Sequence, residues 1–391
     1  MADTRALDRE YIVPTYKRYD VNIVKGSGAL LYDETGKEYV DMGAGIATNS
    51  FGACDPVWVA AVEEQLGKIQ HASNLYYTDP YAKLAELLCE KTGMKKAFFC
   101  NSGAEANECA IKTARKWAAE NKGEEYFTVV TMKNSFHGRT LATLAATGQD
   151  VFHKDFLPVT PGFAYAEPED IDGLRSVLES EKCAAVLLET VQGEGGVRPL
   201  STEYLKAVSA LCEEFNVLLM IDEVQTGNGR CGYFYSYMQH GIEPDVVTTA
   251  KGLGGGLPVG AVLFSEKTAG VLTPGTHGST FGGNPVCCAG AVSIVSRIDG
   301  EFLASVRAKS DKIFASLSGK PGIKGVYGRG LLVGVEVDGE PAAFINKCIE
   351  KGVLVLGAKG RVRLAPPLNI PDELLDRALA VITEIAAGEE I

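Results

Sequence analysis

A lysine and an aspartate each follow directly on a short apolar run. The run NVLLMID ends in Asp222, and the run DVVTTAK ends in Lys251. Runs of this kind, rich in β-branched residues, are typical of buried strands, and ligands gather where parallel strands end. A partly desolvated lysine amine at such an edge has a lowered pKa and can attack an aldehyde. The alternative is that Lys251 and Asp222 form an ion pair that caps two strand ends.

Glycines surround the lysine and favour the chemical interpretation. Gly252, Gly254, Gly255 and Gly256 follow Lys251 within the stretch AKGLGGGLPVGA. Without side chains they leave room for a flat cofactor beside the amine. A carboxylate such as Asp222 can hold a pyridine nitrogen protonated, which is what the chemistry of pyridoxal 5'-phosphate (PLP) requires. The pair and its glycines therefore indicate a PLP site.

Two stretches can bind the phosphate of such a cofactor. Ser102, Gly103 and Ala104 lie where an apolar run meets a helical pattern in FFCNSGAEANECAIK. Backbone N–H groups and the helix dipole attract anions at a helix N-terminus. A plain helix cap made by Asn101 or Ser102 is the alternative. The second stretch is the glycine-rich loop GTHGSTFGGNP, with its hydroxyl side chains.

Strands and helices alternate through the middle of the chain. The runs EEYFTVVTM, AAVLLE, NVLLMIDEV and DVVTTA predict buried strands, and STEYLKAVSALCEEF predicts a helix. Alternation of this kind predicts a mostly parallel sheet. After a long helical stretch near 285–318, the chain predicts a smaller α/β lobe. We expect an N-terminal segment over 1–45 packed on that lobe, a large domain over 46–285 and a small domain over 286–391.

Composition narrows the class of protein. The 391 residues are 46% hydrophobic and 23% charged, with a net charge of -12, which opposes binding to nucleic acid or an anionic membrane. The ten cysteines form no C-x-x-C pair, and packing is the better interpretation for them. No metal-ligand spacing, signal sequence or membrane span is predicted, so we expect a cytoplasmic protein. The stretch GNGRCG matches G-x-G-x-x-G, but its context argues against dinucleotide binding.

Taken together, the motifs resemble the class III (ornithine-type) group of PLP-dependent aminotransferases, which have fold type I. The resemblance runs almost end to end and in the family's order: NSGAEANE, SFHGRT, VQGEGGV, IDEVQTGNGR, AKGLGGGLPVGA, HGSTFGGNP and VRLAPPL. It implies a large domain with a mostly parallel seven-stranded sheet, a smaller C-terminal α/β domain, bound PLP, and a homodimer with composite active sites.

The resemblance also implies a role for each motif residue. Lys251 would carry the cofactor and Asp222 would pair with its pyridine nitrogen. The remaining cofactor contacts would be Phe136 on the ring, Gln225 on the phenolic oxygen, Ser102, Gly103 and Ala104 on the phosphate, and Thr280 from the other subunit. The substrate contacts would be Arg139 and Arg363 on carboxylates, Glu194 paired with Arg363, and Asn74 and Ser279. Taken singly, Phe136 and His137 are also consistent with packing, Arg139 with a helix cap and Arg363 with a surface ion pair.

Within the family, GIATNSFG and HASNLYYT are most similar to the members that act on N2-acetyl-L-ornithine, with 2-oxoglutarate as the acceptor. Asn74 lies in the second motif, where ornithine enzymes tend to carry an aromatic residue, so it favours an acylated donor. Succinylornithine, N-succinyldiaminopimelate, ornithine and 4-aminobutyrate remain alternative donors. A non-catalytic dimer of the same fold and a PLP-dependent racemase or decarboxylase are alternatives from other classes.

Overall fold

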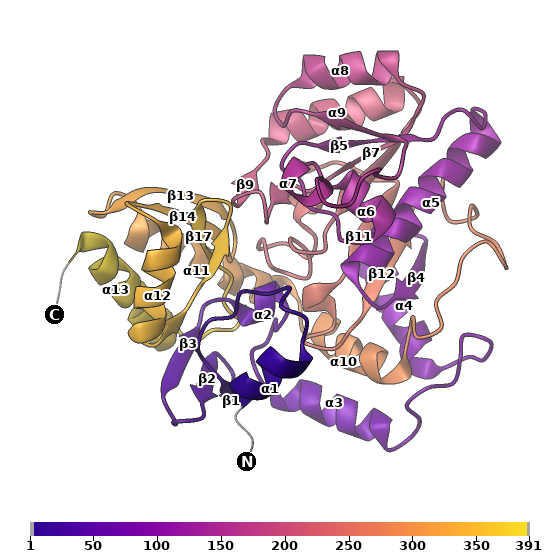
Figure 1. Cartoon of the computed structure of the whole chain (residues 1–391). Helices are drawn as coiled ribbons and strands as arrows, with labels where there is room; N and C mark the ends of the chain where they lie inside the picture. Colours follow the sequence, from indigo (N-terminus) through magenta and orange to yellow (C-terminus); the bar gives the residue numbers. More distant parts are fainter. Residues whose placement is uncertain (1–3, 389–391) are drawn as a thin grey trace.

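A computed structural model describes residues 4–388, and its centre is a seven-stranded sheet. The strands lie in the order β4-β12-β11-β10-β7-β5-β6 (Figure 1). Strands β11, β10, β7, β5 and β6 are parallel, and β12 is antiparallel to β11 and to β4. The mostly parallel seven-stranded sheet predicted from the sequence is confirmed. The strands are β4 (Lys96–Cys100), β5 (Thr128–Met132), β6 (Phe163–Ala166), β7 (Cys183–Leu188), β10 (Leu218–Asp222), β11 (Val246–Thr249) and β12 (Gly260–Phe264).

Helices cover this sheet because its central strands are apolar on both faces. Every residue of β5, β7, β10, β11 and β12 is buried. In the predicted helix STEYLKAVSALCEEF, Leu205, Val208 and Leu211 all face the core, and the Ser201 side chain caps the first turn. The helices of this lobe are α3 (Pro56–Leu66), α4 (Asp79–Thr92), α5 (Gly103–Asn121), α6 (Leu141–Ala146), α7 (Asp150–His153), α8 (Ile171–Ser180), α9 (Thr202–Glu214) and α10 (Pro285–Val295), with the 3-10 turns η1 (Ser236–His240) and η2 (Lys251–Leu253). The short strands β8 (Val191–Gln192) and β9 (Arg198–Pro199) pair with each other.

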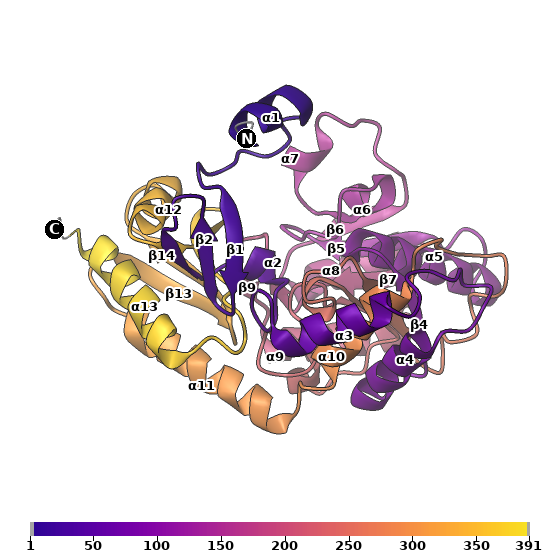
Figure 2. The same cartoon turned by 90° about the horizontal axis from the view of Figure 1, so that it is seen from below.

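The second lobe joins the two ends of the chain. One of its sheets has the order β13-β14-β17-β16, and the other, β1-β2-β3-β15, pairs N-terminal strands with a C-terminal one. Figure 2 shows α13 and α11 on one side of this lobe and α1 at the edge of the molecule. The strands are β1 (Ile23–Ser27), β2 (Leu30–Asp33), β3 (Glu38–Asp41), β13 (Ile323–Arg329), β14 (Leu332–Val337), β15 (Val353–Leu354), β16 (Leu356–Ala358) and β17 (Arg361–Leu364); the helices are α1 (Thr4–Tyr11), α2 (Ala44–Ala47), α11 (Gly300–Leu317), α12 (Pro341–Glu350) and α13 (Asp372–Ala387).

The stretch 285–318 differs from its prediction as one long helix. It forms two helices, α10 and α11, because the Asp299 side chain accepts a hydrogen bond from Phe302 N and caps a new helix there. Helix α10 packs against α3 and α4, and its buried side chains belong to the core of the larger lobe. The predicted domain boundaries at 45/46 and 285/286 stay predictions.

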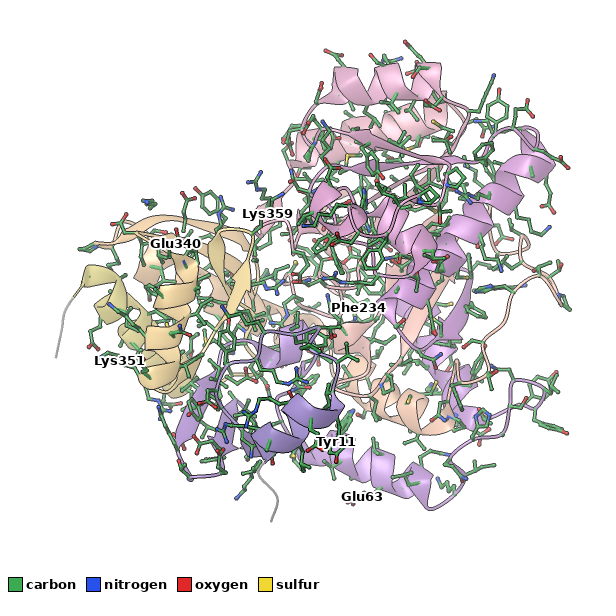
Figure 3. All side chains as sticks on the ribbon, in the orientation of Figure 1. Tyr11, Glu63, Phe234, Glu340, Lys351 and Lys359 are labelled. Carbon is green, nitrogen blue, oxygen red and sulfur yellow. The ribbon has the colours of Figure 1, made fainter. Side chains whose placement is uncertain are left out.

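Buried and exposed polar contacts join the two lobes. Arg230, from the GNGRCG stretch, is buried and donates hydrogen bonds to the carbonyl oxygens of Leu331 and Pro366. Lys359 lies at the boundary between the lobes (Figure 3) and donates to the side chain of Asn134. Strand β17 is therefore held against the larger lobe on the side where β10 and β11 end.

Candidate active site

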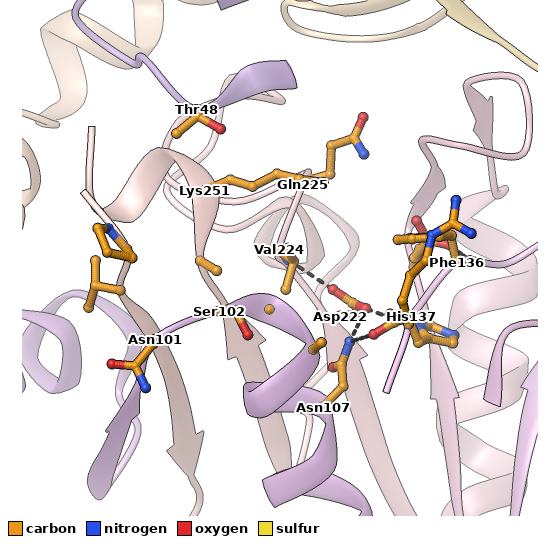
Figure 4. Close-up of a pocket in the computed structure, with 18 of the residues that line it drawn as sticks. Thr48, Asn101, Ser102, Asn107, Phe136, His137, Asp222, Val224, Gln225 and Lys251 are labelled. Carbon is orange, nitrogen blue, oxygen red and sulfur yellow. Dashed lines mark hydrogen bonds and ion pairs between the residues drawn. The ribbon is translucent and has the colours of Figure 1, made fainter. Parts of the chain in front are cut away.

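A cavity of about 440 Å³ lies at the carboxyl ends of β10 and β11. Asp222 is the last residue of β10, and Lys251 follows β11 after one residue. Figure 4 shows both side chains in the cavity wall, together with the start of α5. The lining residues include eight of those predicted from the sequence, namely Ser102, Gly103, Ala104, Phe136, Arg139, Asp222, Gln225 and Lys251. The prediction that parallel strands bring Asp222 and Lys251 to one site agrees with this arrangement.

Lys251 is held in a backbone conformation that L-residues seldom adopt. Its φ is +44°, in the left-handed region, which costs a non-glycine residue on the order of 1 kcal/mol or more. Burial lowers the pKa of its amine. The carboxylate of Glu194 partly opposes this lowering, and the guanidinium of Arg363 adds to it. A lowered pKa increases the share of unprotonated amine at neutral pH, and this is the form that attacks a carbonyl.

Asp222 is fixed by three hydrogen-bonding partners. Its Oδ2 lies 2.8 Å from Asn107 Nδ2 and 2.8 Å from His137 Nδ1, and its Oδ1 accepts from Val224 N at 2.9 Å. Dashed lines in Figure 4 trace these contacts. Asn107 also donates to the His137 carbonyl oxygen, so the three side chains form one buried network. His137 is therefore a partner of the central carboxylate, in addition to a packing residue.

The N-terminus of α5 opens into the cavity. Ser102 caps the helix by accepting a hydrogen bond from Glu105 N, and the N–H groups of the first turn have no acceptor within the helix. A Cβ atom built on Gly103 would lie 2.6 Å from Val224 Cγ1, so only glycine fits this close approach. The helix cap and the anion cradle are thus compatible, because the cap uses the Ser102 side chain and leaves the first N–H groups free.

A buried glutamate, absent from the sequence predictions, supports one side of the cavity. Glu189 accepts hydrogen bonds from Phe136 N at 3.0 Å and Gly193 N at 3.3 Å. Burial raises the pKa of Glu189 to about 7. Its carboxylate ties the backbone of Phe136 to the turn that carries Glu194.

Arg363, Glu194 and Gln225 form a second polar group beside the cavity. Arg363 Nη1 donates to Glu194 Oε1 and, at 2.9 Å, to Gln225 Oε1, while Gln225 Nε2 donates to Glu194 Oε1 at 3.2 Å. The Arg363 side chain is only 3% exposed, whereas that of Glu194 is 28% exposed. Arg363 is therefore a buried residue and not part of a surface ion pair. Arg363 lowers the pKa of Glu194 against the opposing effect of burial.

Besides Glu194 and Arg363, three predicted site residues lie outside the cavity lining, namely Asn74, Ser279 and Thr280. Asn74 is exposed, and its amide donates to the carbonyl oxygens of Ser279 and Gly282. The Ser279 hydroxyl accepts from Gly282 N within its own loop at 3.0 Å, and from Asn101 Nδ2, a residue of the cavity lining, at 3.2 Å. Thr280 is exposed and does not line the cavity. Within one chain, the loop 279–282 thus does not line the cavity but bonds one residue of its lining, Asn101.

Comparison with known proteins identifies the family. The model of the family Aminotransferase class-III matches residues 11–386. The chain belongs to the class-III aminotransferases. It is 45% identical over 383 residues to the acetylornithine aminotransferase of Haemophilus ducreyi, a match that covers 97% of this chain and 98% of the relative. It is 41% identical over 380 residues to the succinylornithine transaminase of Salmonella newport, covering 95% and 93% of the two chains.

Among solved structures, this class-III aminotransferase is similar to the ornithine aminotransferase of Toxoplasma gondii. The TM-score is 0.94 at 35% identity, with 98% of this chain and 94% of the other covered. The family shows that the chain is a PLP-dependent enzyme that transfers amino groups, with PLP fold type I. This family assignment favours an aminotransferase over a racemase, a decarboxylase or a non-catalytic scaffold.

The residues around the cavity fit PLP on three points. The Asp222 carboxylate, which Asn107 and His137 hold in place, suits a protonated ring nitrogen. The free N–H groups at the start of α5 suit a phosphate. The Lys251 amine, with its lowered pKa, suits attachment to an aldehyde. Among residues 4–388 there is no group of three or more histidine, cysteine or acidic side chains placed to hold a metal ion, and no helix long and apolar enough to cross a membrane.

Asn107, His137 and Glu189 were not assigned a site role from the sequence. Asn107 follows Gly103 by four residues on the same helix, so helical periodicity places it on the face that meets the cavity. His137 and Glu189 meet Phe136 and Asp222 only through long-range packing. No local pattern in the sequence identifies those contacts.

Proposed function

We propose that this aminotransferase moves the terminal amino group of N2-acetyl-L-ornithine to 2-oxoglutarate. The products are N-acetyl-L-glutamate 5-semialdehyde and L-glutamate, a step of arginine biosynthesis. The name of the Haemophilus ducreyi relative supports the donor. The observation that carries the proposal is the ion pair of Arg363 with Glu194, which can offer or withdraw a positive charge beside the cavity.

Lys251 and Asp222 carry out the central chemistry in this proposal. Bound PLP supplies an aldehyde that accepts the amino group and a ring that withdraws electrons from the reacting carbon. Lys251 Nζ would hold the cofactor by its aldehyde and, as a free amine, would take up and return the proton of the reacting carbon. Asp222 keeps the ring nitrogen protonated, and Asn107 and His137 hold its carboxylate in place.

The other cavity residues hold the cofactor. Ser102, Gly103 and Ala104 bind the phosphate, and Phe136 stacks on the ring with its backbone held by Glu189. Gln225 bonds the phenolic oxygen of PLP, and its amide already lies between Glu194 and Arg363. Movement of that ion pair therefore acts on a residue that contacts the cofactor.

The two arginines distinguish the two substrates. Arg139, at the cavity, binds the α-carboxylate of acetylornithine, which lies several bonds from the reacting amine. 2-Oxoglutarate carries a carboxylate beside its reacting carbonyl, and Arg363 binds this group once Glu194 has moved away. Arginine suits both positions because its planar fork binds a carboxylate through two hydrogen bonds.

A panel of amino donors tests the proposed function. Acetylornithine, succinylornithine, N-succinyldiaminopimelate, ornithine and 4-aminobutyrate are each assayed with 2-oxoglutarate, and glutamate formation is followed. We expect acetylornithine to have the highest kcat/KM. A higher value for ornithine or 4-aminobutyrate would contradict the donor assignment, and a higher value for a succinylated donor would correct the acyl group.

We also propose that the enzyme is a homodimer with shared active sites. Leu75, Tyr76 and Tyr77 form an apolar run that is 72% to fully exposed in a single chain, and Phe281 is 62% exposed. Contiguous apolar surface of this kind is typical of subunit interfaces. The run adjoins Asn74, which holds the loop of Thr280. A partner bound there would receive Thr280 at its phosphate site.

Subunit mixing tests the shared site. Heterodimers of Lys251→Ala and Thr280→Val subunits contain one site with both native residues, so activity should return after subunit exchange. Exchange of each variant with itself is the control. No recovery in heterodimers of verified composition would mean that each chain builds its own site. We place the enzyme in the cytoplasm, whose reducing conditions suit ten cysteines that are all free within residues 4–388, and cell fractionation checks this.

A further inference from the structure

We propose that Phe152 positions Arg139 and so sets the preference of the enzyme for donors that carry an α-carboxylate. The proposal rests on the role given to Arg139 in the proposed function. Phe152 lies in α7, outside the motifs that carry the family resemblance and outside the lining of the cavity. It is a positioning residue, because it reaches the substrate only through Arg139.

Arg139 lies against two aromatic rings and forms no ion pair within the part of the chain that the structure describes. Its Cζ lies 4.4 Å from the centroid of the Phe152 ring and 5.7 Å from that of Phe136. Among residues 4–388, no carboxylate or carbonyl oxygen accepts a hydrogen bond from its guanidinium. Arg363, by contrast, is paired with Glu194. Arg139 is therefore an exposed cation whose place is set by two rings and whose donors are available.

A ring face and a carboxylate use different parts of a guanidinium. The aromatic face attracts the planar cation from above, whereas the N–H donors point outward in the plane. Stacking on Phe152 thus restricts the rotation of the long side chain without using any donor. An arginine restricted in this way loses less conformational freedom when a carboxylate binds it through two hydrogen bonds.

Phe152 is itself held from two sides. Its ring meets the ring of Phe136 edge-on, with centroids 5.8 Å apart. At one end of α7, Gln149 Nε2 donates to the Ser135 carbonyl oxygen at 3.0 Å. At the other end, His153 Nε2 lies 2.8 Å from the Leu144 carbonyl oxygen, in α6. The same short helix therefore supports both the ring that stacks on PLP and the arginine that binds substrate.

The test compares two donors that differ by one carboxylate. N-acetyl-1,4-diaminobutane is N2-acetylornithine without its α-carboxylate. In Phe152→Leu holoenzyme, we expect kcat/KM for acetylornithine to fall about 3- to 10-fold, mainly through KM, since this is the range of one cation–π contact. For N-acetyl-1,4-diaminobutane we expect a change of less than about 2-fold. Phe152→Tyr, which keeps the ring face, should behave as the wild type.

Arg139→Gln provides the second arm. If Phe152 acts through Arg139, Phe152→Leu should have no further effect on acetylornithine in the Arg139→Gln background. Equal losses for both donors, or a loss that persists without Arg139, would overturn the proposal. The absorbance of bound PLP and the melting temperature check that each variant is folded and loaded. Phe152→Met, whose longer and more flexible side chain can fill the space of the ring, replaces Phe152→Leu if that variant loses PLP.

Two more measurements, on the control Phe215→Leu and on Arg139→Gln alone, distinguish an error in the role of Phe152 from an error in the role of Arg139. Phe215→Leu removes the ring under Arg175, whose Cζ lies 5.6 Å from the ring centroid, and neither residue lines the cavity. This control variant should use both donors as the wild type does. If Arg139→Gln spares acetylornithine, the proposed anchor is wrong and the role of Phe152 falls with it. If Arg139→Gln selectively harms acetylornithine while Phe152→Leu does not, only the role of Phe152 is wrong.

Discussion

Replacement of Glu194 by glutamine should separate the two half-reactions. The change keeps the shape of the side chain but removes the charge opposite Arg363. In the acetylornithine half-reaction an alkyl chain lies beside Arg363, and an unpaired buried guanidinium there is unfavourable. In the 2-oxoglutarate half-reaction the incoming carboxylate no longer has to displace Glu194. Glu194→Gln should therefore slow the first half-reaction and favour binding of 2-oxoglutarate in the second.

The burial of Arg363 sets the magnitude. An exposed or partly exposed ion pair is worth about 1 kcal/mol or less. Arg363 is 3% exposed, while Glu194 is 28% exposed and Gln225 also accepts from Arg363. We therefore expect loss of the Glu194 charge to cost about 2 kcal/mol. This is the range of a hydrogen bond to a charged group, and it is below the cost of breaking a fully buried ion pair. The rate of the acetylornithine half-reaction should therefore fall about 30-fold, since about 1.4 kcal/mol corresponds to a factor of ten.

Stopped-flow single turnovers measure each half-reaction alone, through the change in cofactor absorbance. Acetylornithine is mixed with the aldehyde form of the enzyme, and 2-oxoglutarate with the aminated form. Arg363→Ala should show the opposite pattern and harm the 2-oxoglutarate half. Glu336→Gln is the control. It removes the charged partner of Arg361, which lies on β17 like Arg363, and it should change neither rate. Equal losses in both halves for Glu194→Gln would show that the pair maintains the shape of the pocket and does not switch.

Two further predictions concern cofactor binding and stability. Gly103→Ala should weaken PLP binding, measured by equilibrium dialysis, because its Cβ would lie 2.6 Å from Val224 Cγ1, whereas Gly270→Ala, with open space at that position, should not. Burial raises the pKa of Glu223 from 4.5 to about 7, so its contribution to stability is present below about pH 4.5 and is lost as the pH rises through 7. The melting temperature of the wild type minus that of Glu223→Gln should thus be larger at pH 5 than at pH 8. The same comparison for the exposed Glu213→Gln should show no such dependence on pH. A larger difference at pH 8 would contradict the raised pKa of Glu223.

The sequence predicted the centre of the site because strand ends can be read locally. Apolar runs that end in Asp222 and Lys251 place both residues at one sheet edge, and the glycines after Lys251 mark an open wall. The antiparallel strand β12 between β11 and β4 was not predicted, since strand order depends on contacts between distant segments.

The surroundings of the site required three-dimensional packing. His137 meets Asp222, and Phe152 meets Arg139, only after the chain has folded. The burial of Arg363 likewise depends on the closeness of the two lobes and is invisible in VRLAPPL. Thr280 remains exposed in a single chain, so its predicted role needs the partner subunit.

Lys251 is the residue that holds PLP and releases it to the donor in the proposed mechanism. Borohydride reduction of the holoenzyme, followed by peptide mass spectrometry, locates the attached cofactor. We predict one modified lysine, Lys251, and loss of that modification when acetylornithine is added without 2-oxoglutarate before reduction. Attachment to another lysine, or a Lys251 modification that acetylornithine does not remove, would contradict the account.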